Sequence, residues 1–457
     1  MDRTSITDTG RQALASMRWL FATARIVGIL LLALLLGSWQ QSAREPVTLS
    51  YFRLGWSQPD EQPTTESIAQ QFIRATGIHL KDLPVPENTL DQLDASRKLL
   101  ERGTGPDVIG VDLIWSGVLG NELIDLRPYL ATEIPSLEPE LLPSYTIDGK
   151  LVAIPYKVQA GVLEYRADLL REYGYRHPPK TWDELERMAA RIQAGQRAKG
   201  KIDFWGYVWQ GAAAEALTCN ALEWQASEGG GRIIESNRRI TVNNPATIRA
   251  WKRAKRWIGW ISPPGVVGYH EIDSINVFDS GGAAFNRVWG GTGITRRGLS
   301  RQIHWRSTLA EARTGYTSMP SGPEGSAATL GGSGLAVSRH SLHPKEAIEL
   351  VRFLIRAQIK ADEEEEKAAP YQPHIHDRPL ASELFNHSDN LNSHRSGIVS
   401  RPSSLTGEKY EQVARAYIDA VHAVLTGQKG APEAAAELEK ELAKITGFTI
   451  AAPQKAN

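Results

Sequence analysis

A block at residues 203–231 combines residue types that suit the binding of a small polar molecule. It reads DFWGYVWQGAAAEALTCNALEWQASEGGG, followed closely by ITVNNP. Trp209 and Trp224 offer flat apolar faces, and Gln210 and Glu215 offer polar groups, which together are what a small-molecule cleft requires. The block therefore indicates a sugar-sized pocket. The alternative is a Trp-rich core helix followed by a glycine turn.

Length and composition limit the class of protein. The chain of 457 residues exceeds one comfortable core, so two lobes are expected. Lys plus Arg equals Asp plus Glu at 52 each, which gives no electrostatic reason to expect a nucleic acid as partner. Cys219 is the sole cysteine, so an internal disulfide and a cysteine-based zinc cluster are excluded. No phosphate loop, dinucleotide fingerprint or catalytic triad motif is present, so we expect no cofactor.

The N-terminal 43 residues have the layout of an export signal or an N-terminal membrane anchor. Arg3, Arg11, Arg18 and Arg25 precede an unbroken apolar run at residues 26–36. That run is shorter than the roughly 20 residues that span a bilayer comfortably, and both interpretations stay open. Either one places the rest of the chain outside the cytoplasm, in the periplasm or an equivalent compartment, with tethering to the inner membrane as one form.

The remainder alternates short apolar runs with helical periodicity, which is typical of α/β architecture. Strands are expected at residues 47–53, 105–115 and 151–157, and a flexible loop entering a strand at residues 329–338. Helix signals occur at a start near Thr65 with Gly77 as its stop, a Thr181–Glu184 capping box, an Asn244 cap before Pro245, a start at Pro344, and an alanine- and glutamate-rich surface helix at residues 431–444. The acidic run at residues 362–367 predicts a solvated helix face.

Five segments resemble one protein family. They are PDVIGVDLIW, IPYKVQAGVLEYRADLL, the block above, ISPPGVVGYHE and LGGSGLAVSRHSLHPKEA. They are similar to the trehalose/maltose-binding branch of the extracellular solute-binding proteins, which serve carbohydrate ABC importers. The resemblance implies a two-lobed type II periplasmic-binding-protein fold with an interlobe ligand cleft and hinge strands. Residues 47–156 plus 316–370 would form the first lobe, and residues 157–315 plus 371–450 the second.

The resemblance also implies which residues contact the ligand. Matching positions are Asp112, Trp115, Trp209, Gln210, Glu215, Arg287, Trp289 and Arg401, with Glu61 at a looser spacing. Asp112 would accept bonds from sugar hydroxyls, although a lone Asp at a strand end equally predicts a cap on the next turn. Trp289 would stack on a sugar ring.

Several positions depart from the family pattern. Gln159 stands where an Asp is usual, and Ser333 stands in place of a Trp. Ala214, Gly290 and Gly291 also replace larger residues. Loss of aromatic platforms widens a cleft and removes stacking, so trehalose or maltose specificity does not follow from the resemblance.

The sequence therefore predicts a monomeric receptor that captures a di- or oligosaccharide and delivers it to ABC permease subunits, without catalysis. Two alternatives stay open. One is a membrane-anchored sensory ectodomain on the same fold, and the other is an exported glycoside-active enzyme with Asp112 and Glu215 as its two carboxylates. His374, His376 and Asp377 lack the spacing of a metal site, and we expect a surface loop there and no metal.

Overall fold

The computed structural model describes residues 46–52, 67–84, 86, 89–137, 139–290, 313–368 and 397–451. Its strands are β1 (Thr48–Phe52), β2 (His79–Asp82), β3 (Val108–Asp112), β4 (Thr146–Ile147), β5 (Lys150–Leu151), β6 (Ile154–Arg166), β7 (Trp205–Val208), β8 (Arg239–Ile240), β9 (Ala283–Gly290), β10 (Thr314–Ser318), β11 (Ala327–Val337), β12 (Gly397–Val399) and β13 (Thr449–Ile450). Its α-helices are α2 (Ile68–Thr76), α3 (Thr89–Glu101), α4 (Ser116–Leu119), α5 (Ala167–Glu172), α6 (Trp182–Ala198), α7 (Glu215–Ser227), α8 (Pro245–Trp257), α9 (Glu271–Asp279), α11 (Pro344–Ala368), α13 (Ser403–Thr406), α14 (Tyr410–Thr426) and α15 (Ala431–Thr446).

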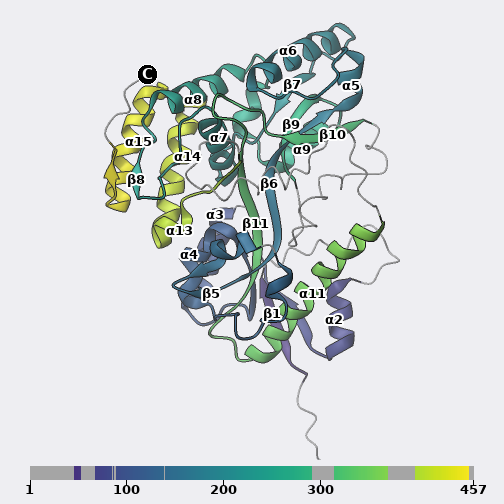
Figure 1. The fold of residues 1–457 in the computed structure, drawn as a ribbon, viewed down its shortest axis with the longest axis vertical. Coiled ribbons are helices and arrows are strands. Elements are labelled where there is room, and N and C mark those ends of the chain that lie inside the picture. The colour runs from purple at the N-terminus through teal and green to yellow at the C-terminus, as the bar shows by residue number, and fades with distance from the viewer. Residues whose placement is uncertain are drawn as a thin grey trace, which may run out of the picture.

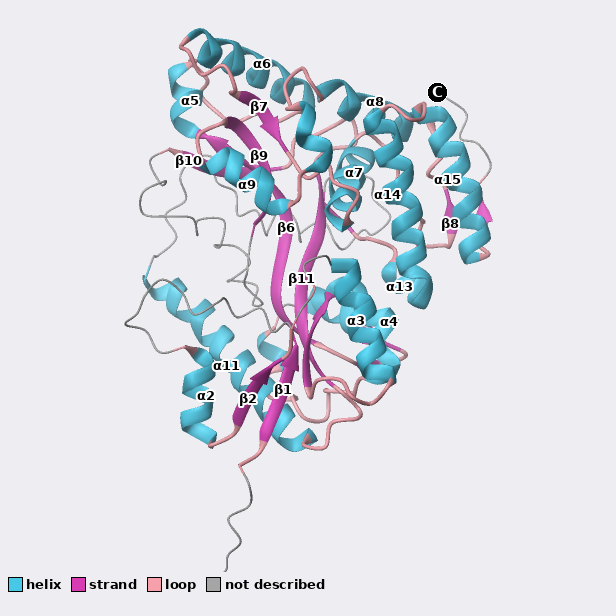
Figure 2. Cartoon of the chain, turned by 180° about the vertical axis from the view of Figure 1, so that it is seen from behind, coloured by secondary structure: helices cyan, strands magenta, loops and turns pink. Residues whose placement is uncertain are grey.

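Two long strands, β6 and β11, connect two α/β bodies (Figure 1). They lie side by side in the middle of one sheet with the order β2-β1-β3-β11-β6-β9-β7 (Figure 2). The first half of β6 pairs with β11, and its second half pairs with β9 and β10. At about 3.3 Å per residue, a strand of 13 residues is long enough to serve both bodies. The mixed α/β fold predicted from the sequence is confirmed.

The buried apolar side chains form two large clusters, which we call the first core and the second core. The first core surrounds Trp115 and includes the β11 end at Leu335 and the start of α14 at Tyr410. The second core contains the aromatic side chains of α6, α7 and α8, together with Met319 and Ala327. Residues at the start of β11 therefore pack with the second body. The lobe boundaries at residues 156 and 315 stay a prediction.

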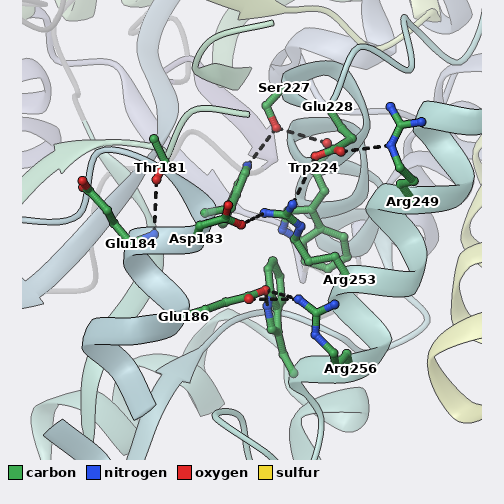
Figure 3. A network of polar contacts seen from close by, with 12 residues as sticks. Thr181, Asp183, Glu184, Glu186, Trp224, Ser227, Glu228, Arg249, Arg253 and Arg256 are labelled. Atoms are coloured by element: carbon green, nitrogen blue, oxygen red, sulfur yellow. Dashed lines mark hydrogen bonds and ion pairs between the residues drawn. The ribbon is translucent and has the colours of Figure 1, made fainter. Parts of the chain in front are cut away.

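Local capping signals position the helices as expected, with one correction. Gly77 ends α2 with φ 71°, and the Asn244 side chain accepts bonds from the first amides of α8. Helix α2, expected to start near Thr65, begins at Ile68 with Ser67 as its cap. Thr181 caps α6 through the amide of Glu184 (Figure 3). The Glu184 carboxylate accepts its bond from the amide of Lys180, so the expected reciprocal capping box is not formed.

Three other sequence expectations were wrong in detail. The glycine-rich run at residues 329–338 is not a loop entering a strand, because it belongs to β11 as far as Val337, with φ 127° at Gly332 and a register shift after Ser333. The strand expected at residues 151–157 begins at Ile154 and continues to Arg166. In the acidic run at the end of α11, Asp362 is buried and accepts a bond from Gln358, so that face is not wholly solvated.

The N-terminal 45 residues, and the segment with His374, His376 and Asp377, lie outside the described residues. Within the part that is described, no helix has the length and apolarity needed to cross a bilayer.

Candidate functional site

The strand register brings five of the expected site residues onto one face of the shared sheet. Paired residues on neighbouring strands, and residues two apart on one strand, direct their side chains to the same face. Ser333 pairs with Asp112 and with Lys157, Gly331 pairs with Gln159, Gly161 pairs with Trp289, and Leu163 pairs with Arg287. The residues that share this face are therefore Asp112, Ser333, Gln159, Trp289 and Arg287. They lie where β6 and β11 pass from the first body to the second, a region that we call the junction.

Helix α7 covers this face and contributes two buried carboxylates, Glu215 at its first residue and Glu223 two turns later. In both views of the chain α7 lies beside β11 (Figures 1 and 2). Each carboxylate pairs with a buried arginine. The site therefore has an apolar frame with a few oriented charges.

The Glu215 cluster joins four segments of the chain. Glu215 Oε1 accepts bonds from Arg401 Nη1 at 3.0 Å and from the Tyr410 hydroxyl at 2.5 Å. Arg401 Nη2 donates to the Leu330 carbonyl at 3.1 Å and lies 3.8 Å from Asp112 Oδ1. Because Tyr410 belongs to the first core and Glu215 lies in α7, this cluster ties together residues from both bodies.

Burial sets the electrostatics of the Glu215 cluster. It raises the pKa of Glu215 above its ordinary value, and Arg401 and the Tyr410 hydroxyl oppose this only in part. Burial also lowers the pKa of Arg401, but the surrounding acidic groups, Glu215 and Asp112 among them, raise it well above its ordinary value. The pKa of Tyr410 is raised, first by burial and then by Glu215. Arg401 therefore stays charged, and Tyr410 stays a hydrogen-bond donor.

The second carboxylate, Glu223, holds Arg287 and was not found by sequence reasoning. Arg287 Nε donates to Glu223 Oε2 at 3.1 Å, and Nη2 donates to Oε1 at 2.7 Å. Thr329 adds its amide at 3.0 Å and its hydroxyl at 2.6 Å to the same Oε1. One signal was available in the sequence: Arg287 is the only charge in the strand AAFNRVWG, and a buried charge requires a buried partner.

Trp289 is the aromatic side chain at the junction. Its ring is half-buried, and the Arg287 guanidinium carbon lies 4.0 Å from the ring centroid. The ring reaches across β6 to β11, since a Cβ built on Gly331 would lie 2.7 Å from its nearest ring atom. Because the side chain is only half-buried, part of the indole stays accessible for contacts.

Trp209 and Gln210 lie in the second core and not at the junction. Trp209 is 0% exposed, packs edge-on against Trp224 at 4.9 Å, and donates to the Ser262 hydroxyl. The Gln210 amide donates to the Arg287 carbonyl and to the hydroxyl of Ser274. Both residues lie between β7 and α7 and are buried, so for them the expectation of a core role describes the structure, although neither is in a helix.

Four further expected site residues have plain outcomes. Trp115 is fully buried in the first core, and Asp112 caps the following turn by accepting a bond from the Ile114 amide at 3.2 Å. Its side chain also stays 15% exposed beside Arg401, so the cap does not exclude contact with a ligand. Arg287 is fully buried. Glu61 lies outside the described residues.

Two residues bear on other chemistry. Burial raises the pKa of the Cys219 thiol to about 12, so this residue stays a protonated, unreactive side chain in the second core. Lys157, on the same sheet face as Gln159, was also missed by sequence reasoning, and burial lowers its pKa. Among the described residues, no group of three His, Cys, Asp or Glu side chains is arranged to hold a metal ion.

Two α/β bodies that share long strands, with polar and aromatic side chains at their junction, define the maltose-binding-like type II periplasmic-binding-protein fold. Residues 55–361 match the sequence model of the bacterial extracellular solute-binding proteins, and the chain belongs to that family.

Individual relatives agree with this assignment. The chain is 38% identical over 393 residues to a protein of Deinococcus radiodurans named probable ABC transporter-binding protein, covering 83% of this chain and 89% of that one. It is 27% identical to maltose-bound MalE3 of T. maritima, with a TM-score of 0.69 over 87% of this chain and 100% of that chain. The GacH receptor of Streptomyces glaucescens, at 20% identity and a TM-score of 0.66, shares the fold.

Proposed function

We propose that the protein is the extracytoplasmic solute-binding component of an ABC importer and that its ligand is a carbohydrate of two or more sugar units. The observation that carries the proposal is the half-buried ring of Trp289 beside Asp112, Gln159 and Ser333 at the junction of the two bodies. A flat apolar face next to hydrogen-bonding groups matches the alternating apolar faces and hydroxyl edges of a sugar. The family and the resemblance to a maltose-bound protein support the same class of ligand.

The binding mechanism follows from the shared strands. A ligand that contacts both bodies favours the closed arrangement by its difference in affinity for the closed and open forms. Asp112 and Ser333 stand on the first-body side of the junction, and Trp289 stands on the second-body side. One sugar held between these groups brings the bodies together, and the closed form is then the one that permease subunits recognise.

The carboxylates support binding over glycoside hydrolysis. A glycosidase needs one protonated carboxyl and one carboxylate, both facing the glycosidic bond. Here Arg401 lies between Asp112 and Glu215, and Glu215 is only 5% exposed and engaged by Tyr410. In this proposal Asp112 accepts hydrogens from sugar hydroxyls, while Glu215 keeps Arg401 in place.

A calorimetric titration of the purified protein with maltose, trehalose, maltotriose, tagatose and ribitol tests the proposal. We expect saturable binding of at least one sugar and a loss of about tenfold in affinity in Trp289→Ala, since stacking on an aromatic ring is worth up to about 1.5 kcal/mol. Trp260→Ala is the matched control, because Trp260 is a 41% exposed tryptophan beside Arg256 that is not among the expected site residues. Saturable binding of a peptide or polyamine, with no response to any sugar, would contradict the carbohydrate assignment.

The N-terminal segment is tested separately. We propose that residues 1–43 direct export and that the rest of the chain works outside the cytoplasm, free or tethered. Mass spectrometry of the mature N-terminus in the membrane and soluble fractions distinguishes these forms. A chain that starts near residue 44 is a released receptor, and a chain that keeps residue 1 in the membrane fraction is a tethered one.

A further inference from the structure

The side chains of Glu223, Arg287 and Trp289 form a row on the sheet face that α7 covers. The row ends at the junction, with Trp289. Glu223 binds Arg287 through two hydrogen bonds, and the Arg287 guanidinium covers one face of Trp289. Along β9, Arg287 lies deeper in the second body than Trp289, because Phe285 pairs with Tyr165 while Gly290 pairs with Ala160. The covered face of the indole is therefore the one that the second body already occupies.

Glu223 and Arg287, the two fully buried members of this row, are held rigidly. Arg287 and Glu223 are both fully buried, and both Glu223 oxygens accept charge-assisted hydrogen bonds from the same guanidinium. Thr329 of β11 adds two more bonds to Glu223, which fixes the carboxylate to a strand that both bodies share. Arg287 Nη2 also donates to the Thr329 hydroxyl at 3.2 Å. Among the described residues, Arg287 Nη1 has no hydrogen-bond partner, and the guanidinium lies against the Trp289 ring.

Two glycines make room for the row. A Cβ on Gly161 would overlap Glu223 Oε1 and lie 2.6 Å from Arg287 Nη2. A Cβ on Gly331 would lie 2.7 to 3.2 Å from three ring atoms of Trp289. Neighbouring positions on β6 and β11 thus lack side chains where the three side chains lie. The sheet surface is shaped to hold the indole in one orientation.

We propose that Glu223 is a positioning residue for ligand binding, which acts through Arg287 to fix the orientation of the Trp289 ring. This inference rests on the proposed function, in which Trp289 stacks on a sugar. Glu223 never touches the ligand. Its carboxylate holds the guanidinium, the guanidinium holds one face of the indole, and the opposite face is presented to the sugar without a conformational cost at the moment of binding.

The test follows Trp289 directly in the full-length protein labelled with 5-fluorotryptophan. The chain has 13 tryptophans, and the ¹⁹F resonance of Trp289 is the one lost in Trp289→Phe. Two variants disturb the row: Glu223→Gln removes the charge that holds Arg287, and Arg287→Lys keeps the buried charge pair but removes the planar group from the ring. We expect both to shift or broaden the Trp289 resonance without ligand, and to weaken maltose binding by about threefold to tenfold.

Glu186→Gln is the matched control. Glu186 is also a buried carboxylate of the second body, where it accepts bonds from Arg256 at 2.8 and 2.9 Å and from the indole of Trp257 at 2.7 Å (Figure 3). Its loss disturbs another carboxylate–arginine pair of the second body, in which the Arg256 side chain is exposed. We expect a lower melting temperature in this variant, with the Trp289 resonance and the maltose affinity as in the wild type.

The outcomes separate positioning from stability and from the proposed function. An unchanged Trp289 resonance in Glu223→Gln, or in Arg287→Lys if the first variant does not fold, overturns the positioning role. If Trp289→Ala loses sugar binding while both row variants keep it, the proposed function stands and the positioning role falls. If the wild type binds no sugar of the panel, the proposed function fails, and the ligand-free spectra still decide whether Glu223 orients the ring.

Discussion

Helix α7 carries two buried carboxylates, Glu215 and Glu223, whose hydrogen bonds differ. At Glu223, both carboxylate oxygens are bonded, to Arg287 and to Thr329, within the second body. At Glu215, Oε1 takes both bonds, from Arg401 and Tyr410. Among the described residues, Glu215 Oε2 has no hydrogen-bond partner. The Glu223 carboxylate is therefore bonded through both oxygens, and the Glu215 carboxylate through one.

The difference indicates different roles for two similar pairs. A carboxylate that is bonded through both oxygens is held in one arrangement, whereas a buried carboxylate oxygen without a partner costs free energy that a rearrangement can recover. The Glu223 pair supports a ring within one body. The Glu215 pair joins segments of both bodies beside Asp112, where closure on a ligand changes the surroundings. Buried carboxylates at this junction thus serve positioning and connection, and no catalytic step is needed to explain them.

Replacement of Arg287 or Arg401, one at a time, is expected to change the free energy of unfolding more than the other substitutions. Arg287→Met leaves the fully buried carboxylate of Glu223 without a cation, which costs about 3–5 kcal/mol in the free energy of unfolding. Arg401→Met costs less, because Glu215 already has a raised pKa and escapes the penalty by taking up a proton. Urea unfolding at pH 7 measures both. An equal or larger loss in Arg401→Met would contradict the distinction between the two pairs.

A methyl group added at Gly161 tests how tightly Glu223 and Arg287 are packed. In Gly161→Ala the new Cβ overlaps Glu223 Oε1 and crowds Arg287, so we expect a loss of about 1–3 kcal/mol in the free energy of unfolding. Gly397→Ala is the control in β12, where no atom lies within 4 Å of the added Cβ. Thermal unfolding of both variants checks this. If Gly161→Ala unfolds like the control, the pair is looser than its geometry indicates.

Local signals in the sequence were sufficient to predict individual helix ends. The Asn244 cap and the Gly77 stop act within a few residues of themselves, so they mark helix ends correctly without knowledge of the tertiary structure. Motif resemblance supplied the two-body arrangement. The glycines of β11 led to a wrong loop prediction, because contacts with distant parts of the chain explain them. A side chain on Gly332 would overlap the Lys157 carbonyl, and one on Gly334 would meet Tyr145.

The site was harder to predict because the sequence does not say which way a buried helix faces. Nearly every residue of α7 is buried, so no apolar stripe distinguishes the side of Trp224 from the side of Glu223. The aromatic block therefore looked like a pocket, although Trp209 and Trp224 pack in the second core. Trp289 was identified from motif resemblance, but its dependence on Glu223 required the register of three strands.

The smallest expected effect is a pH dependence that belongs to the Glu215 pair. Burial raises the pKa of Glu215 above its ordinary value of 4.5, so between 4.5 and the raised pKa the native state holds more protons than the unfolded state. The stability that this group contributes is therefore fully present below pH 4.5 and is lost as the pH rises through the native pKa. Glu215→Gln has no such proton, so we expect the stability of wild type minus variant to fall with rising pH above 4.5, by at most about 1.4 kcal/mol per pH unit.

Glu133→Gln provides the control of opposite sign. Burial alone would raise the pKa of Glu133, but Thr132 and Arg356 outweigh it and lower the pKa below 4.5. Its contribution to stability is present above pH 4.5 and is lost as the pH falls through the lowered pKa, so the difference between wild type and this variant rises with pH below 4.5. Urea unfolding in steps from pH 3 to pH 8 separates the two windows. A Glu215 difference that rises with pH would show that Arg401 and Tyr410 outweigh burial, and the two pairs of α7 would then be equally satisfied.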